Sequence, residues 1–305
     1  MRRKEFLGLN CVELNIGQID FIVSKSVGPR ILSLSFKGGE NLFAELTDDF
    51  LEYPGDGNFC FYGGHRLWVA PEDPFVTYIP DDQPIKIGES SGFVELIQEI
   101  NQTTGIQKSI RIRLTDYENM VVIDHLIHNR GDLPFKCAPW AITQFKLGGI
   151  AILPQQIKGI DGNTLLPDRS IVLWTYTDIN DLRIRWGNKF IFVGPESFDQ
   201  ALKIGMTNTH KWMAYFYHNL LFIKYAENYV TDKLVDQGAT SECYCNSKFI
   251  ELETLGPLKQ IEPGKTIQHR EVWRIVDTPF TNLSQETMMD FVENDEMADI
   301  CREML

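Results

Sequence analysis

Apolar and polar residues alternate with a period of two along most of the chain, which is the pattern of half-buried β-strands. Residues 11–16 and 19–23 predict a hairpin around Gly17, and residues 30–36 predict the next strand. Turn-forming residues such as Gly187-Asn188 separate the strand-like runs. Further runs of this kind lie at residues 93–100, 106–114, 120–129, 135–145, 171–176, 182–186, 189–193, 212–218, 221–225, 249–254 and 266–276.

This many short strands without interleaved helices excludes the alternating βαβ architectures. We therefore expect an all-β fold, one large antiparallel sandwich over residues 1–280, because no proline- or serine-rich linker divides the chain. The C-terminal segment, residues 281–305, differs from the rest of the chain in the spacing of its apolar residues. It carries apolar residues near helical spacing, such as Met288, Phe291 and Val292, and predicts one short helix packed on the sandwich.

Composition narrows the possible functions. The 305 residues include 29 Lys and Arg against 42 Asp and Glu, a formal net charge of −13. This balance argues against binding to nucleic acid or to an anionic membrane surface, both of which need clustered basic residues. A basic start without a following apolar run predicts no secretory signal, and six scattered cysteines are typical of reduced thiols. We expect a cytoplasmic protein.

The segment 59–74 is richest in side chains capable of chemistry. Gly63 and Gly64 allow close backbone approach or positive φ. A sugar site needs an apolar ring face for stacking and charged hydrogen-bonding groups at its edge. The alternative is a turn with a core tryptophan and a surface ion pair. The candidate binding residues after the two glycines are His65, Arg66, Trp68 and Glu72.

Two carboxylates, Glu251 and Glu253, share one face of the strand predicted at residues 249–254. Such neighbours repel each other unless they are solvated or partnered. Burial would raise the pKa of at least one of them, which is how proteins make a general base that works near neutral pH. The alternative is an exposed strand face without a function.

A third cluster, His210, Lys211 and Trp212, is a candidate for the same cleft. By contrast His125 alternates with apolar residues, which predicts a histidine satisfied within the core. The sequence has no phosphate-binding loop, no Gly-x-Ser-x-Gly motif and no His-Glu-x-x-His motif. Because the histidines are dispersed along the chain, we expect no metal site.

Several short segments together point to a known family, namely residues 28–31, 39–44, 62–68, 70–72, 139–141, 249–254 and 263–264. They resemble the galactose mutarotase-like (aldose 1-epimerase) superfamily. The resemblance spans about residues 8–278, and the middle segments are most similar to the uncharacterised DUF4380-type branch. It implies a β-supersandwich whose concave face binds carbohydrate.

The resemblance also implies a reaction. In mutarotases a glutamate removes the proton of the anomeric hydroxyl and a histidine protonates the ring oxygen. Glu253 matches the glutamate best, with Glu251 as its neighbour, whereas no histidine follows Asn129 where the family has one. His65 or His210 would have to serve as the acid, and a histidine within about 6 Å of the Glu253 carboxylate would indicate catalysis.

Three functions remain open at this point. One is a sugar 1-epimerase, for which we expect no cofactor because only protons move, and the alternative is a non-catalytic carbohydrate-binding or sensing protein that uses the same face. The third is a structural or protein-binding role with the acidic C-terminal helix as the contact. The cationic side chains of Arg66 and Lys211 point to an anionic sugar as the small-molecule partner. The expected substrate-binding residues are Arg66, Trp68, Glu72, Trp140, Lys211, Trp212 and Glu251.

Overall fold

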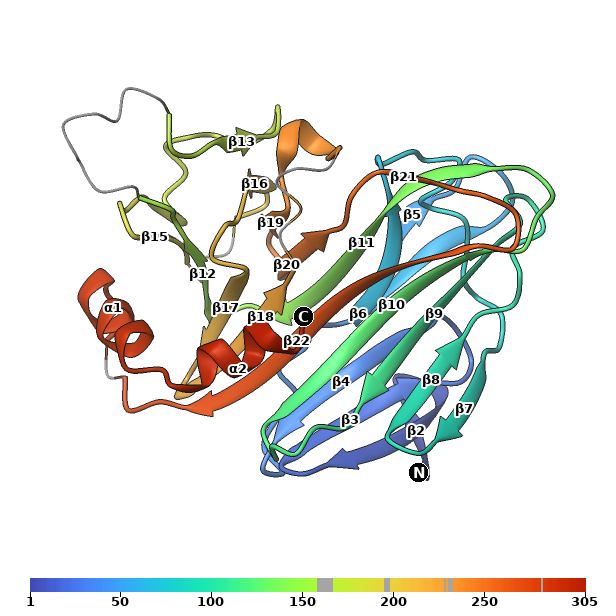
Figure 1. Cartoon of the computed structure of the whole chain (residues 1–305), viewed down its shortest axis with the longest axis horizontal. Helices are drawn as coiled ribbons and strands as arrows, with labels where there is room; N and C mark the ends of the chain where they lie inside the picture. The colour runs from blue at the N-terminus through green and yellow to red at the C-terminus, as the bar shows by residue number, and fades with distance from the viewer. Residues whose placement is uncertain (158–166, 195–197, 228, 230–232, 281) are drawn as a thin grey trace.

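Two large antiparallel sheets face each other in the computed structural model, which describes residues 1–157, 167–194, 198–227, 229, 233–280 and 282–305 (Figure 1). Within these residues the first sheet has twelve strands, in the order β1 (Arg2–Phe6), β2 (Leu9–Ile16), β3 (Ile19–Ser24), β4 (Arg30–Phe36), β6 (Asn58–Ala70), β11 (Phe135–Lys146), β20 (Phe249–Leu255), β19 (Ser241–Cys245), β16 (Leu202–Met206) and β13 (Ile171–Leu173), with β5 (Glu45–Glu52) beside β6 and β21 (Lys259–Ile261) beside β11.

The second sheet has ten strands within the described residues. Their order is β14 (Ile184–Arg185), β15 (Phe190–Val193), β12 (Ile150–Pro154), β17 (Trp212–Tyr217), β18 (Leu220–Ala226), β22 (Thr266–Asp277), β10 (Met120–Asn129), β9 (Ile106–Arg113), β8 (Phe93–Ile97) and β7 (Lys86–Ser90). The all-β sandwich predicted from the alternating pattern is therefore confirmed. One helical turn, η1 (Asp236–Gly238), precedes β19.

The C-terminal segment differs from the prediction of a single helix, because it forms α1 (Gln285–Glu293) and α2 (Met297–Glu303). Asn294 ends α1, where its side-chain amide donates a 2.8 Å hydrogen bond back to the carbonyl of Asp290. Both helices lie against the outer face of the second sheet, where Met288 and Cys301 pack in one cluster with Trp212 (Figure 1). No helix among the described residues is long and apolar enough to span a bilayer.

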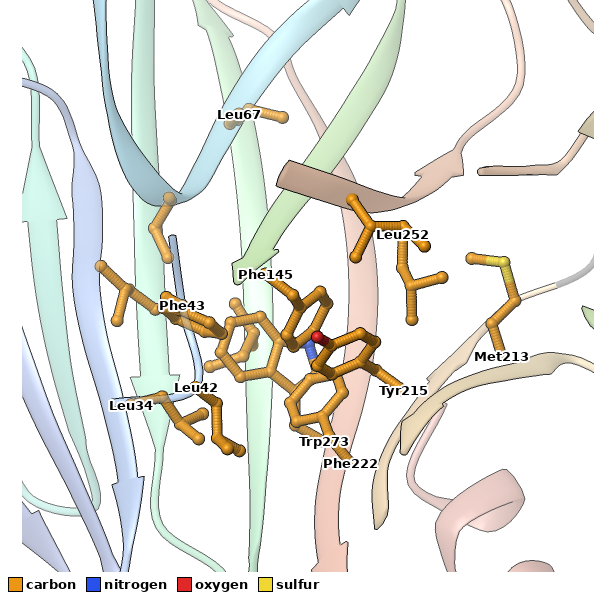
Figure 2. Close-up of a cluster of buried hydrophobic side chains, with 14 of the residues drawn as sticks. Leu34, Leu42, Phe43, Leu67, Phe145, Met213, Tyr215, Phe222, Leu252 and Trp273 are labelled. Carbon is orange, nitrogen blue, oxygen red and sulfur yellow. The ribbon is translucent and has the colours of Figure 1, made fainter. Parts of the chain in front are cut away.

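A cluster of aromatic side chains lies between the two sheets, surrounded by the aliphatic side chains of the core (Figure 2). The Trp273 ring, on β22, meets Phe43 edge-on with ring centroids 6.0 Å apart and Phe222 at 5.4 Å. Phe145, on β11, stacks on Tyr215 of the facing sheet at 4.4 Å. Large buried rings contribute most to core stability, so this cluster fixes how the two sheets lie relative to each other.

Strand β6 is kinked at its centre, where Tyr62, Gly63 and Gly64 all have positive φ angles of 55°, 82° and 73°. A Cβ atom on Gly63 would lie 1.8 Å from the Ala44 carbonyl oxygen, and one on Gly64 would lie 2.1 Å from the Ile31 carbonyl oxygen. Only glycine fits both positions, as the sequence predicted. The first half of β6 pairs with β5 and the second half with β4 and β11.

We predict that Gly64→Ala lowers the free energy of unfolding by at least about 3 kcal/mol, because it adds backbone strain to a clash with main-chain atoms. The matched control is Gly92→Ala, which also has positive φ but no atom within 4 Å of the new Cβ. It should cost only about 1–2 kcal/mol. Urea unfolding measures both, and equal losses for the two variants would contradict the close approach at Gly64.

Candidate functional site

A cleft with a volume of about 710 Å³ lies on the face of the first sheet that points away from the second sheet. Side chains of β6, β11, β20, β19 and β16 form its floor, since strand alternation sends every second residue to this side. In register across the sheet, Arg66 lies opposite Ile142, which in turn lies opposite Glu253. Strands distant in sequence therefore bring their polar side chains to one surface.

The first charged pair of the floor joins β6 to β20. Arg66 Nη2 lies 3.2 Å from Glu251 Oε1, and both side chains are buried. Burial raises the pKa of Glu251 to about 7, although Arg66 works in the opposite direction, and the nearby Glu253 raises the pKa further. Glu251 therefore changes its charge near neutral pH, which is the property of a useful general base.

Lys203, from β16, forms the second charged group. Its Nζ lies 2.6 Å from Glu242 Oε2 and 2.8 Å from Glu253 Oε2. Trp140 Nε1 also donates a hydrogen bond of 2.7 Å to Glu253. Burial alone would lower the pKa of Lys203, but the two carboxylates raise it well above its ordinary value. Burial also raises the pKa of Glu242 well above its usual range, with Lys203 opposing that rise.

Aromatic side chains form the walls around these charges. The Arg66 guanidinium lies 4.3 Å from the centre of the Trp68 ring, and Lys203 Nζ lies 4.6 Å from Trp140 and 4.7 Å from Trp174. Two buried groups in the cleft have N–H donors without a partner among the described residues. These donors are Trp68 Nε1 and the Nε and Nη1 atoms of Arg66.

The structure brings five of the residues predicted from the sequence to the cleft. The lining includes Arg66, Trp68, Glu72, Trp140 and Glu251. Glu72 accepts a hydrogen bond from the Tyr78 hydroxyl at the exposed edge. Glu253 lies on the same face of β20 but is fully buried beneath Trp140 and Lys203, so Glu251 rather than Glu253 borders the open volume.

The structure does not bring the third predicted cluster to the cleft. Trp212 packs on the second sheet, with its ring centre 6.0 Å from that of Phe190, close to the C-terminal helices. His210 lies beside the Gln155 carbonyl at 3.3 Å, and Lys211 pairs with Glu227 at 3.4 Å. The prediction treated these residues as one cluster because they are adjacent in sequence, but they lead into β17, which begins at Trp212 and belongs to the opposite sheet.

His65 also lies away from the cleft, because it precedes Arg66 on β6 and therefore points to the opposite face. It forms a buried cluster between the sheets with His125 and Glu271, whose candidate ligand atoms lie within 4.8 Å of one another. His65 Nε2 is 2.7 Å from His125 Nε2. Histidines that are dispersed in sequence are thus adjacent in space, which their spacing along the chain did not indicate. Three potential ligands this close together make the cluster a candidate for binding a metal ion.

The atoms of this cluster that could bind a metal ion already have hydrogen-bond partners within the protein. His125 Nδ1 donates to the His269 carbonyl at 3.1 Å, which assigns the Nε2 lone pair as the acceptor from His65. His65 Nδ1 accepts from the Thr143 hydroxyl at 2.8 Å. Burial lowers the pKa of both His65 and His125, which keeps the rings neutral. The Glu271 carboxylate is bonded by Thr254 Oγ1, by Lys224 Nζ at 3.1 Å and by Trp273 Nε1 at 2.7 Å.

We therefore interpret the histidine cluster as a hydrogen-bonded support behind the cleft rather than as a metal centre. Lys224 carries an ammonium group next to Glu271, and a bound cation would have to displace it. Thr143 and Thr254 belong to β11 and β20, the strands that carry Ile142 and Glu253 on their other face. The cluster thus ties the central strands of the first sheet to β10 and β22 of the second.

Sequence reasoning missed several side chains of the cleft: Lys203, Glu242, Trp174, Tyr176 and Tyr244. The alternation in β19 would have placed Glu242 and Tyr244 on one face, had residues 241–245 been recognised as a strand. The register then sets Glu242 opposite Glu253 and Tyr244 opposite Glu251. No local signal in the sequence indicates that Lys203 reaches these carboxylates.

No protein-family model matches the chain, and no curated protein matches its sequence. Solved structures do match its fold. A TPR-domain-containing protein from Parabacteroides distasonis has a TM-score of 0.61 and 11% identity, over 91% of this chain and 49% of that one. The chain thus spans about half the length of that protein.

Two further solved structures are similar over their full length. A protein from Escherichia coli K12 that is provisionally assigned as an aldose 1-epimerase has a TM-score of 0.55 and 11% identity, over 88% of this chain and 100% of that one. A galactose mutarotase-like protein from Lactobacillus casei has a TM-score of 0.55 and 10% identity, over 87% and 100%. The chain therefore has the galactose mutarotase-like fold, while its similarity to the DUF4380-type branch stays a prediction.

We predict that Lys203→Met lowers the free energy of unfolding by about 3–5 kcal/mol at pH 8, because it leaves Glu242 and Glu253 buried without their cation. The loss should shrink towards pH 5. Lys203 opposes the rise that burial causes in the pKa of Glu242, so this pKa rises further without the cation. An acid with a raised pKa contributes stability below its unfolded pKa that is lost as the pH rises through its folded pKa.

Urea unfolding at pH 5 and pH 8 measures this effect. Lys86→Met is the matched control, because the Lys86–Glu99 pair is exposed, and it should cost about 0–1 kcal/mol at either pH. Adding Glu242→Gln to Lys203→Met should restore part of the lost stability at pH 8. A pH-independent loss without such rescue would contradict the role given to the Lys203 ammonium.

Proposed function

We propose that this protein binds a carbohydrate in the cleft of the first sheet. The observation that carries the proposal is the presence of unpartnered, buried N–H donors on Trp68 and Arg66, next to an aromatic wall. Buried polar groups are normally hydrogen-bonded, so these donors favour a ligand that supplies oxygen acceptors. A saccharide supplies hydroxyl oxygens at its edge and C–H groups on its faces, which suits this combination of groups.

The charges of the cleft favour a neutral sugar over the anionic one expected from the sequence. Each cation of the lining already has a carboxylate partner among the described residues, and Lys211 lies elsewhere. Arg66 pairs with Glu251, Lys203 with Glu253 and Glu242, and Lys248 with Asp49. An anionic ligand would meet these carboxylates without a cation free to receive it, and like charges in a partly buried site repel strongly.

Sugar 1-epimerisation is the second candidate function, and it is favoured by the pKa and the position of Glu251. A carboxylate with a pKa of about 7 at the edge of the cleft is suited to take the anomeric proton. The provisional assignments of the similar proteins point in the same direction. However, none of the six histidines, all of which are described, lines the cleft. Since the histidine acid of the mutarotase reaction has no counterpart there, binding is the better-supported function.

Saturation-transfer NMR against neutral, amino and acidic monosaccharides, mixed separately with the purified protein, tests both candidates. The same samples report the rate of exchange between anomers. We expect transfer to neutral sugars without accelerated exchange. Transfer with accelerated exchange that Glu251→Gln abolishes would favour the epimerase, and no transfer to any sugar would contradict carbohydrate binding.

We predict that Trp68→Phe weakens binding of the best neutral saccharide by about tenfold, because the variant loses the indole donor and part of the stacking surface. Trp212→Phe is the matched control, since Trp212 is also a buried tryptophan on a strand but lies on the second sheet. Isothermal titration calorimetry should give the control an affinity within about twofold of the wild type. Equal losses in the two variants would place binding outside the cleft.

A further inference from the structure

The aromatic residues of the cleft form a continuous series in which each ring lies next to the following one. Successive ring centres are 5.5, 6.3, 6.1, 5.7 and 6.5 Å apart, all within the range of direct aromatic neighbours. We call this series the aromatic belt. It consists, in order, of Tyr78, Trp68, Phe61, Phe249, Tyr244 and Tyr176, and all six residues line the cleft.

The belt contains more rings than one sugar unit can contact, because a single pyranose ring has only two faces for stacking. Trp140 and Trp174, which flank Lys203, add further rings to the same cleft. The volume of about 710 Å³ also lies in the upper half of the range of about 300–1,000 Å³ in which pockets enclose drug-sized ligands.

We propose that the cleft takes an oligosaccharide, with successive sugar units stacked along the aromatic belt, rather than a monosaccharide. This inference rests on the proposed function and specifies its ligand. A peptide rich in apolar residues would also cover aromatic rings, but the buried, unpartnered donors of Arg66 and Trp68 favour a ligand with many hydroxyl oxygens. The ion-paired floor of the cleft likewise suits a neutral oligosaccharide.

Exposure changes along the belt, which indicates how a bound oligosaccharide would lie. Trp68, the second ring of the belt, is 4% exposed and carries one of the unpartnered donors, whereas Tyr176, the last ring, is 39% exposed. The part of the belt around Trp68 would then provide hydrogen bonds that orient one terminal unit. The exposed end provides a ring face for units further along the chain, where stacking tolerates variation in the hydroxyl groups.

Isothermal titration calorimetry with mono-, di-, tri- and tetrasaccharides of β-1,4-linked glucose, α-1,4-linked glucose and β-1,4-linked galactose tests the inference. In the series that binds, affinity should rise about tenfold from the monosaccharide to the best longer chain, as expected for one or two added stacking contacts. Equal affinity for every length would overturn the oligosaccharide inference and leave the proposed function standing. No binding in any series would contradict both.

The variant Tyr176→Ala distinguishes stacking on the aromatic belt from other effects of oligosaccharide length on affinity. It should lower the ratio of the oligosaccharide affinity to the monosaccharide affinity at least threefold. Trp186→Ala is the control, because Trp186 is 42% exposed, close to the value for Tyr176, and does not line the cleft. It should leave the ratio unchanged. A ratio that Tyr176→Ala does not change, in a variant with the wild-type circular dichroism spectrum, would overturn the role of the belt.

Discussion

Side chains of a β-strand point alternately to its two faces, and this constraint governs the whole molecule. On β6, His65 points to the space between the sheets while Arg66 points to the cleft, and on β20 Leu252 and Glu253 are divided in the same way. Every central strand of the first sheet therefore contributes to the core and to the cleft at once. A one-residue shift in register would exchange the two sets, which is why the apolar core and the polar floor specify the same register.

Burying charge on the cleft side is costly, and the structure offsets the cost by pairing. Arg66 and Lys203 neutralise carboxylates that sit on neighbouring strands, and Trp140 adds a hydrogen bond. A floor of mutually paired charges is stiff, because moving one member leaves another unpaired in a medium of low dielectric. The same pairing leaves no cation of the lining without a carboxylate partner among the described residues, so the proposed recognition of a neutral sugar depends on the aromatic walls and on the unpartnered donors.

The alternating pattern was sufficient to predict the all-β sandwich and the shared face of Glu251 and Glu253. The glycine pair at positions 63 and 64 separately indicated the positive φ angles and the close backbone approach found there. It could not predict which strands lie side by side. Lys203 meets Glu253 only because β16, β19 and β20 pair in that order, and His65 meets His125 only because the two sheets stack. Such contacts depend on long-range pairing that leaves no local signal, and for the same reason the cluster around Trp212 was assigned to the wrong surface.

The central claim is that saccharides bind in the cleft through its tryptophans, and the indole N–H signals of a ¹⁵N-labelled sample test it most directly. The six tryptophans divide between the cleft, with Trp68, Trp140 and Trp174, and the rest of the molecule, with Trp186, Trp212 and Trp273. Titration with the saccharide that binds best should shift the first three signals and leave the other three in place, with Trp68 moving most as its Nε1–H acquires an acceptor. Shifts confined to Trp186, Trp212 or Trp273 would contradict the account.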